Sequence, residues 1–201
     1  PDDAVAMKAY MKNKFEFLGA KTPARRKLTK AFFKQQTDFV IDWDFINEAW
    51  SNSYRELQYA ALDYLESRKK LLTPSDLPCL KKLAQTKSWW DTIDFLDRLV
   101  GSIIARFPET KEIILAWSRD EDIWLRRLAI DHQLLRKEET DTEFLEKILV
   151  NNLDRTEFFI NKAIGWALRD YARTDGDWVR AFVQAHTSLS PLSRREALKR
   201  L

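Results

Sequence analysis

Apolar residues recur along the chain at three- and four-residue spacing, and prolines and small polar residues interrupt them. Five of these polar residues follow one another at steps of 35, 34, 34 and 34 positions, and they are Ser53, Ser88, Asp122, Thr156 and Ser190. Each can accept a hydrogen bond from an N–H group in the first turn of a helix, and Ser53 with Glu56 has the form of a capping box. A period near 34 residues is typical of stacked helical pairs, as in HEAT or armadillo repeats.

The same pattern predicts about twelve helices. Their approximate spans are residues 4–17, 22–36, 42–52, 53–70, 74–87, 88–106, 108–119, 122–137, 140–153, 156–173, 176–188 and 190–201. Pro23 and Pro74 each follow a threonine and fall at the first helical position, where the missing N–H costs nothing. We therefore expect an all-α protein, an α-solenoid of about six antiparallel helix pairs with a concave groove, forming a single domain over residues 1–201.

Alignment of the five helices on their capping residues separates a packed side from an opposite side. Small or branched residues dominate the columns seven and eight residues after each cap, which are Ala60, Phe95, Ala129, Ala163 and Ala197, then Ala61, Leu96, Ile130, Ile164 and Leu198. Such residues let neighbouring helices approach closely. We expect both columns to form the core.

The opposite side of these helices carries aromatic and charged residues. At about 100° per residue, this stripe holds Trp90, Asp94, Arg98, Gly101 and Ala105 in the second repeat, and Phe158, Lys162, Trp166, Arg169 and Arg173 in the fourth. Arg127 lies on the flank of the stripe in the third repeat. Because the second helices of such pairs line the concave surface of a solenoid, we expect the stripe to face the groove.

Each residue of the stripe also has an ordinary structural explanation. A tryptophan in a helical protein usually packs, and an aspartate or arginine on a helix is usually solvated or paired, as Arg98 is expected to be with Asp94 or Asp97. Trp89 lies nearer the packed side and is expected to pack. The four-residue spacing of Trp90 and Asp94, with Trp166 on the corresponding stripe, instead favours a functional site.

Composition excludes several classes of protein. Only 4 Gly and 6 Pro occur among 201 residues, too few turn residues for a many-stranded β fold. The lone Cys79, with His132 and His186, offers neither a disulfide nor a spaced zinc-ligand set, so no metal and no cofactor are expected. No apolar run approaches the ~20 residues that span a bilayer, and the visible start lacks the apolar core of a signal peptide, so we expect a cytoplasmic protein.

Charge is unevenly distributed along the chain. The net charge is only +3, but residues 1–37 hold nine lysines and arginines against three acidic residues, a balance of +6. The remainder of the chain is therefore net acidic. A basic end is compatible with contact to phosphates, and an ordinary solvated helix face explains it equally well.

The stripe combines the groups needed to cleave a glycosidic bond. Lys162, Arg169 and Arg173 beside aromatic side chains suit a polyanion whose sugars or bases also need apolar contact. No nucleophile with a neighbouring base and no glycine-rich phosphate loop is evident. A lone carboxylate can stabilise an oxocarbenium-like sugar and position a water, while flanking indoles exclude solvent. Without a second acid, the leaving base must already carry positive charge, as alkylated purines do.

Five segments of the sequence resemble the AlkD family of DNA alkylation repair glycosylases, from about Tyr10 to the C-terminus. They are MKAYMKNKFEFLGAKTPARR, TKSWWDTIDFL, DIWLRRLAIDHQLL, EFFINKAIGWALRDYA and LSPLSRREALK. The resemblance implies a HEAT-like solenoid that clasps duplex DNA and hydrolyses the N-glycosidic bond of cationic N3- and N7-alkylated purines, such as 3-methyladenine and 7-methylguanine. Glycosylases in general extrude their target base, whereas this family is thought to leave the damaged base stacked.

The resemblance also implies roles for individual residues. Asp94 of SWWDTID corresponds to the catalytic aspartate, with Trp90 and Trp166 as its aromatic neighbours. Arg127 of WLRR corresponds to a DNA-contacting arginine, and Tyr10 of YMKN to a tyrosine near the lesion. From its position alone, Tyr10 would be expected to be a core aromatic.

We expect a monofunctional glycosylase of base excision repair that acts as a monomer on duplex DNA, with no membrane and no obligate protein partner, and with nucleoid association in a bacterial-type cytoplasm. Two alternatives remain open: a DNA-damage or DNA-structure binding protein without turnover, and a helical scaffold for protein partners. Release of free base would distinguish the glycosylase from both the DNA-binding protein and the scaffold. Salt-dependent DNA affinity separates the first two from the scaffold.

Overall fold

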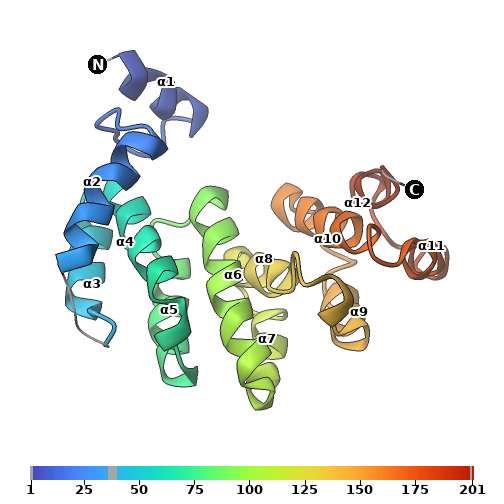
Figure 1. The fold of residues 1–201 in the computed structure, drawn as a ribbon. Coiled ribbons are helices and arrows are strands. Elements are labelled where there is room, and N and C mark those ends of the chain that lie inside the picture. Colours follow the sequence, from blue (N-terminus) through green and yellow to red (C-terminus); the bar gives the residue numbers. More distant parts are fainter. Residues whose placement is uncertain (1, 36–39, 200) are drawn as a thin grey trace. The chain divides into compact units, whose positions relative to one another are not determined.

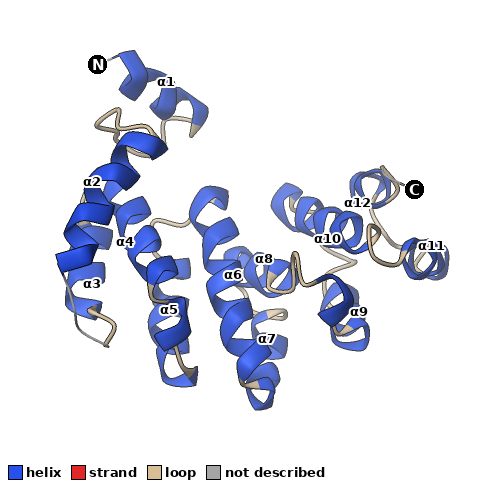
Figure 2. Ribbon diagram, in the orientation of Figure 1, coloured by secondary structure: helices blue, strands red, loops and turns tan. Residues whose placement is uncertain are grey.

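The computed structural model describes residues 2–35, 40–199 and 201. Within these ranges the secondary structure is helical, with no strand and one isolated bridge between Glu16 and Tyr54 (Figure 2). The prediction of an all-α protein is confirmed. No helix among the described residues has the length and apolar character needed to cross a membrane. Contacts divide the chain into two compact units, Pro1–Thr73 and Pro74–Leu201.

The first unit is built on α4. Its helices are α1 (Asp2–Tyr10), α2 (Thr22–Gln35), α3 (Trp43–Ser51) and α4 (Arg55–Ser67), followed by the short 3-10 helix η1 (Lys69–Leu71). Both α2 and α3 pack against α4. The predicted helix over residues 4–17 ends early, at Tyr10, because Lys12 and Asn13 both take a φ of 57° in the left-handed region.

The second unit consists of consecutive helix pairs (Figure 1). Its α-helices are α5 (Leu77–Gln85), α6 (Trp90–Arg106), α7 (Lys111–Trp117), α8 (Ile123–Asp131), α9 (Thr142–Val150), α10 (Phe158–Tyr171), α11 (Gly176–Ala185) and α12 (Pro191–Ala197). Three 3-10 helices, η2 (Pro74–Asp76), η3 (Pro108–Thr110) and η4 (Lys137–Glu139), lie between them. The second helices of the pairs pack in sequence, α6 on α8, α8 on α10 and α10 on α12.

Every predicted helix has a counterpart among the described residues, and most are shorter than expected. The predicted helix over residues 122–137 ends at Asp131, and the turn that follows contains Leu135 at a φ of 68° and Lys137 at 52°. Position 36 of the predicted second helix lies outside the described residues. Apolar spacing therefore located the helices, whereas backbone geometry after their last turn set where they stop.

Two of the five predicted capping residues are confirmed. The Asp122 carboxylate accepts a hydrogen bond from the backbone N–H of Trp124 at 2.8 Å, at the start of α8. The Ser190 hydroxyl accepts from the backbone N–H of Ser193 at 3.1 Å, at the start of α12. Both residues satisfy a donor that the first helical turn leaves unpaired.

The other three predicted caps, Ser53, Ser88 and Thr156, are wrong. Helices α4, α6 and α10 begin later, after Tyr54, Trp89 and Glu157. The Ser88 hydroxyl instead donates to the Ala84 carbonyl at 2.6 Å. A hydroxyl that bonds backward to the preceding helix cannot cap the next one.

The predicted capping box is also wrong, because Glu56 holds a loop. Its buried carboxylate accepts three backbone N–H groups, from Leu18 at 3.0 Å, Gly19 at 2.8 Å and Ala20 at 3.1 Å. These bonds fasten the segment between α1 and α2 to α4. Glu56 therefore stabilises the first unit across 36 to 38 residues of sequence rather than within one helical turn.

The two predicted core columns are largely buried. All their alanines have 7% exposure or less, and Leu96, Ile130 and Ile164 have none. The exceptions are Phe95, which is half-buried, and Leu198, which is exposed. The repeat alignment therefore identified the packed face correctly at most positions.

Gly101 allows α6 to approach the end of α8. A Cβ atom at Gly101 would lie 2.0 Å from the carbonyl oxygen of His132, the residue that follows α8. Only a glycine permits this separation without moving the backbone. The approach fixes how the later turns of α6 meet the last turn of α8.

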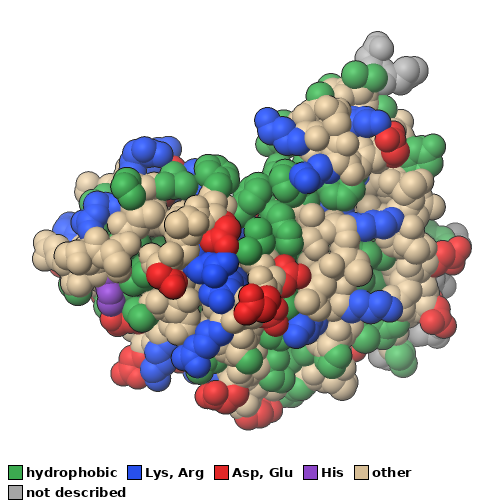
Figure 3. All heavy atoms as spheres, turned by 180° about the vertical axis from the view of Figure 1, so that it is seen from behind, with side chains coloured by type: hydrophobic (Ala, Val, Ile, Leu, Met, Phe, Trp, Pro, Cys, Tyr) green, Lys and Arg blue, Asp and Glu red, His purple; other side chains and the backbone are tan. Residues whose placement is uncertain are grey.

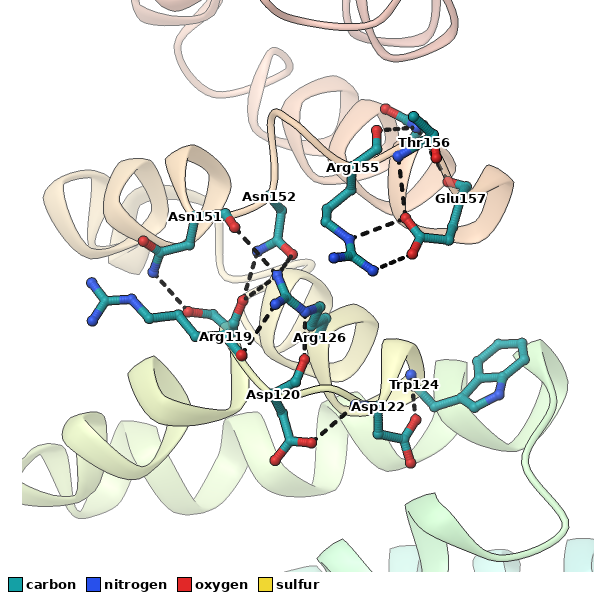
Figure 4. Close-up of polar contacts among 12 residues, drawn as sticks. Arg119, Asp120, Asp122, Trp124, Arg126, Asn151, Asn152, Arg155, Thr156 and Glu157 are labelled. Atoms are coloured by element: carbon teal, nitrogen blue, oxygen red, sulfur yellow. Dashed lines mark hydrogen bonds and ion pairs between the residues drawn. The ribbon is translucent and has the colours of Figure 1, made fainter.

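Arg126 joins three segments of the second unit (Figure 4). Its guanidinium donates to the carbonyls of Asp120 and Arg119, which follow α7, and to those of Ser118 and Asn151, at the ends of α7 and α9. It also donates to Asn152 Oδ1 at 3.1 Å. A cation at two helix C-termini satisfies their unpaired carbonyls and opposes the negative ends of the helix dipoles.

Candidate active site

Asp94 lies in the second turn of α6, four residues after Trp90, the first residue of that helix. The four-residue spacing places both side chains on one face of α6. The Asp94 side chain is 18% exposed and Trp90 is half-buried. Asp94 is therefore sheltered but still reachable from solvent.

Arg127 of α8 binds one oxygen of the Asp94 carboxylate. Its Nε and Nη2 atoms both lie 2.8 Å from Asp94 Oδ1. Its Nη1 donates to the Phe159 carbonyl at 2.8 Å. In the described part of the chain, no hydrogen bond to the other oxygen, Oδ2, accompanies these. An arginine fork can engage both oxygens of a carboxylate, so this arrangement leaves one oxygen open.

Trp166 completes the group from α10. The Arg127 guanidinium carbon lies 6.0 Å from the centroid of the Trp166 ring, within the range of a cation–π contact. Asp94, Arg127 and Trp166 thus come from three successive second helices. Asp94 and Arg127 are 33 positions apart in the sequence, and Arg127 and Trp166 are 39 apart. The repeat alignment placed all three on or beside one stripe, and the structure brings them together.

Trp89 packs, as predicted. Its ring lies 5.6 Å from that of Trp124 and 5.0 Å from that of Phe159, centroid to centroid. Phe159 also supplies the carbonyl that accepts from Arg127. The aromatic cluster of these three rings therefore supports the arginine that holds Asp94.

Burial and ion pairing shift the pKa values of Asp94 and Arg127 in opposite directions. Burial raises the pKa of Asp94, and the neighbouring Arg127 guanidinium lowers it, with a net shift above its ordinary value of 3.8. Burial works to lower the pKa of Arg127, but Asp131 and Asp94 outweigh it and the pKa rises. Arg127 is therefore a permanent cation, and its charge favours the ionised form of the half-buried Asp94 carboxylate against the effect of burial.

Asp97 and Asp131, which sequence reasoning missed, lie behind the ion pair. Both side chains are fully buried. Asp131 Oδ2 lies 3.7 Å from Arg127 Nη2, and Asp97 Oδ1 lies 3.6 Å from Arg98 Nε. A signal was available: each follows its expected cap by nine residues, so two acids occupy equivalent positions beside the packed face.

Comparison with known proteins identifies the family. The family profile described as DNA alkylation repair enzyme matches residues 1–201. The chain belongs to this family. A solved structure described as a predicted DNA alkylation repair enzyme from Enterococcus faecalis is 33% identical, with a TM-score of 0.93 over 100% of this chain and 95% of the other. No curated protein matches.

A more distant relative shares the fold of these alkylation repair enzymes. AlkD2 from Streptococcus mutans is 13% identical, with a TM-score of 0.67 over 98% of this chain and 99% of the other. The predicted AlkD-like family and helical-repeat solenoid are therefore confirmed. The roles of individual site residues are a separate matter and stay predictions.

Two of the predicted DNA-binding residues of this repair enzyme are held by one carboxylate. Glu196 of α12 pairs with Lys162 at 2.8 Å and with Arg169. These pairs lower the pKa of Glu196, chiefly through the hydrogen bond from Lys162. Arg173, just beyond α10, is exposed, whereas Lys162 and Arg169 are half-buried. Of these cations, Arg173 is the most accessible to a phosphate.

Arg127 and Tyr10 have contrasting environments. The Arg127 side chain is only 4% exposed and contacts Asp94, so its direct contact with DNA stays a prediction that requires the pair to open. Tyr10 ends α1 in the first unit and is 69% exposed. The alternative that Tyr10 is a core aromatic is wrong.

Three carboxylates of the site lie close enough to be considered as metal ligands. Asp94, Asp97 and Asp131 each offer an oxygen within 4.8 Å of the others. The Arg127 guanidinium already lies against two of them, at 2.8 Å and 3.7 Å. A divalent cation there would be repelled by this fixed charge, so the residues fit an ion-pair cluster better than a metal centre. The expectation of no metal stays a prediction.

We expect Glu196→Gln to strengthen binding to duplex DNA several-fold at low salt, because Lys162 and Arg169 would no longer be neutralised. The slope of log K against log salt should steepen by about one unit for each of these two cations that comes to neutralise a phosphate. Fluorescence anisotropy over a salt series measures both effects. Glu112→Gln, at an exposed position, makes the same change in net charge. Equal affinities for the two variants would show that neither cation reaches DNA.

Proposed function

We propose that this chain is a monofunctional DNA glycosylase that hydrolyses the N-glycosidic bond of cationic N3- and N7-alkylated purines in duplex DNA. The observation that carries the proposal is the half-engaged carboxylate of Asp94, with Oδ1 bound by Arg127 and Oδ2 open. The family assignment supplies the context, alkylation repair of DNA.

The open oxygen suits both tasks of such a reaction. As the C1′–N bond breaks, its electron pair moves onto the alkylated base and neutralises the positive charge there. The sugar becomes oxocarbenium-like, and the Asp94 carboxylate stabilises this cation at close range. A water held by Oδ2 attacks C1′, and its proton passes to the carboxylate and then to solvent. The products are a neutral free base and an abasic site.

The surroundings of Asp94 support this chemistry. Trp90, on the same face of α6, and Trp166, beside Arg127, provide apolar walls that displace bulk water from the sugar. Charge interactions are stronger in such an environment than in water. Because the leaving base carries its own positive charge, the site needs no second acid and no cofactor.

Cations on and after α10 serve the DNA backbone in this proposal. Arg173 is accessible, and Lys162 and Arg169 become so when a phosphate competes with Glu196. Red and blue side chains are interspersed on the face drawn in Figure 3, in keeping with the small net charge of +3. Binding should therefore depend on a few placed cations, with Tyr10 of the first unit as a further contact.

Incubation with duplex DNA that carries 7-methylguanine or 3-methyladenine, followed by chromatography of the freed bases, tests the proposal. We expect free base to appear with time and to scale with enzyme. DNA affinity that falls with salt, without any base release, would instead indicate a binding protein. Neither release nor salt-dependent affinity would indicate a scaffold for protein partners.

A further inference from the structure

Two carboxylates behind the Asp94–Arg127 pair each have a guanidinium at 3.6 or 3.7 Å but lack the hydrogen bonds that buried charges require. Asp97 of α6 and Asp131 of α8 have 0% exposure. Within the described residues, none of their four carboxylate oxygens has a hydrogen-bond partner. Buried ionised carboxylates are almost always paired and hydrogen-bonded, because the cost of removing such a charge from water is otherwise not recovered.

The charges around these carboxylates do not balance if all of them are ionised. Asp94, Asp97 and Asp131 have oxygens within 4.8 Å of one another. The cations are the buried Arg127, which is bound chiefly to Asp94, and the half-exposed Arg98, at 3.6 Å from Asp97. From α10, Asp170 adds a further negative charge facing Asp131. One buried guanidinium cannot neutralise so many anions.

The residue that follows α8 adds no cation. His132 is buried, and its Nδ1 donates to the Ala129 carbonyl at 2.6 Å in the tautomer that this contact requires. Burial lowers the pKa of His132 to about 4, so the ring is neutral at physiological pH. Protons on the carboxylates themselves are the remaining way to reduce the negative charge.

We propose that Asp97 and Asp131 retain protons at neutral pH and act as positioning residues for Asp94: while both are uncharged, the Arg127 guanidinium stays on Oδ1 of Asp94 and leaves Oδ2 open. The inference rests on the proposed glycosylase function for its effect on catalysis. Burial followed by repulsion from Asp94 raises the pKa of Asp97 to about 8, and burial raises that of Asp131 well above its ordinary value.

Loss of these protons changes the competition for Arg127. An ionised Asp131 would attract Nη2, which now lies 3.7 Å from its Oδ2 and 2.8 Å from Asp94 Oδ1. An ionised Asp97 would repel Asp94 on the next turn of the same helix. Base release should therefore decline as the pH rises past about 8, through kcat rather than through DNA binding.

Thermal unfolding tests the protonation without any substrate. A carboxyl group whose pKa rises from 3.8 to about 8 on folding favours the folded state fully below pH 4, and this contribution is lost as the pH rises to about 8. Asp97→Asn removes the group and keeps its shape. We expect the melting temperature of the variant to exceed that of the wild type increasingly between pH 5 and pH 8, by ~5 °C or more at pH 8.

Base release tests the positioning role. Asp97→Asn and Asp131→Asn each replace a protonated carboxyl with an amide of similar shape, and the readout is the ratio of base release at pH 9 to base release at pH 7 within each variant. The alkaline decline should be weaker in both variants than in the wild type, measured on the same methylated duplex. Arg98→Gln, which removes the exposed cation beside Asp97, should make the decline begin at higher pH.

Three outcomes would overturn the inference. Parallel melting profiles of Asp97→Asn and wild type across the pH range would show that no proton is held. A loss of release beyond tenfold at pH 7 in a folded variant would show that ionised carboxylates are required. Failure of both variants to fold would show that the folded state requires ionised carboxylates at these positions. Absence of release by the wild type would contradict the proposed function alone, since the melting profiles would still decide the protonation.

Discussion

Asp94→Asn is expected to reduce the release of 7-methylguanine from methylated duplex DNA by at least about 100-fold, the usual effect of removing one group that stabilises charge in a transition state. The substitution keeps the shape of the side chain and an oxygen that can accept from Arg127. It removes the negative charge that faces the sugar. DNA affinity should stay within about threefold of the wild type, because Asp94 itself contributes no attraction to phosphate.

Single-turnover release of free base, with enzyme in excess, measures the chemical step directly. Asp177→Asn provides the control, since Asp177 is an exposed aspartate of α11 and the substitution changes the net charge equally. Release by Asp177→Asn should match the wild type. Undiminished release by Asp94→Asn would remove Asp94 from the mechanism and return the choice to the binding alternatives.

Gly101→Ala is expected to destabilise the protein by at least about 2 kcal/mol, in the range found for overpacked cores. Alanine normally stabilises a helix by about 1 kcal/mol relative to glycine. Here the added Cβ would lie 2.0 Å from the carbonyl oxygen of His132, so backbone atoms must move. The clash therefore outweighs the gain in helix propensity.

Urea unfolding followed by circular dichroism measures this loss as a lower midpoint at unchanged slope. Gly176→Ala is the matched control, because a Cβ there would meet only side-chain ends, Leu201 Cδ2 at 2.6 Å and Arg180 Nη1 at 3.3 Å. Its midpoint should stay close to that of the wild type. A stable Gly101→Ala would mean that α6 can move away from α8 at little cost. Asp97 and Asp131 would then not be held together as rigidly as the structure indicates.

The positions of the helices and their packed face could be predicted from the sequence, because helical periodicity is a local property repeated over many residues. Eight of the ten residues in the two predicted core columns are buried as expected, Ala129 and Ile130 among them. Capping was less predictable. Ser88 has the right residue type and spacing, but its hydroxyl has a competing acceptor in Ala84, and the sequence does not show which bond forms.

The candidate site was predictable where it follows the repeat. Asp94 and Trp166 lie on equivalent stripes of their helices, and the structure places both beside Arg127. The environment of Arg127 was not predictable, because five residues after its cap it could equally have faced solvent. Its burial depends on the Phe159 carbonyl, 32 residues away.

The buried acids show why polar residues near a packed face are difficult to interpret. Asp97 lies one position beyond Leu96, a core residue, so spacing alone suggested a solvated flank or a partner for Arg98. Because α6 and α8 pack closely, Asp97 is buried between them and not exposed to solvent. The sequence contains the two acids at equivalent positions, but the distance between the helices depends on Gly101 and on tertiary packing.

A negative group that must work beside a polyanion would ordinarily weaken the encounter with it. Coupled to the guanidinium 2.8 Å away, the Asp94 carboxylate forms a compact dipole, whose field decays with distance faster than that of a lone charge. The field of this dipole is weak at phosphates several ångströms away. At an atom in van der Waals contact with the open oxygen, the field is nearly that of the full negative charge. The ion pair therefore weakens the repulsion between Asp94 and distant phosphates, while the interaction of the carboxylate with an atom in direct contact stays strong.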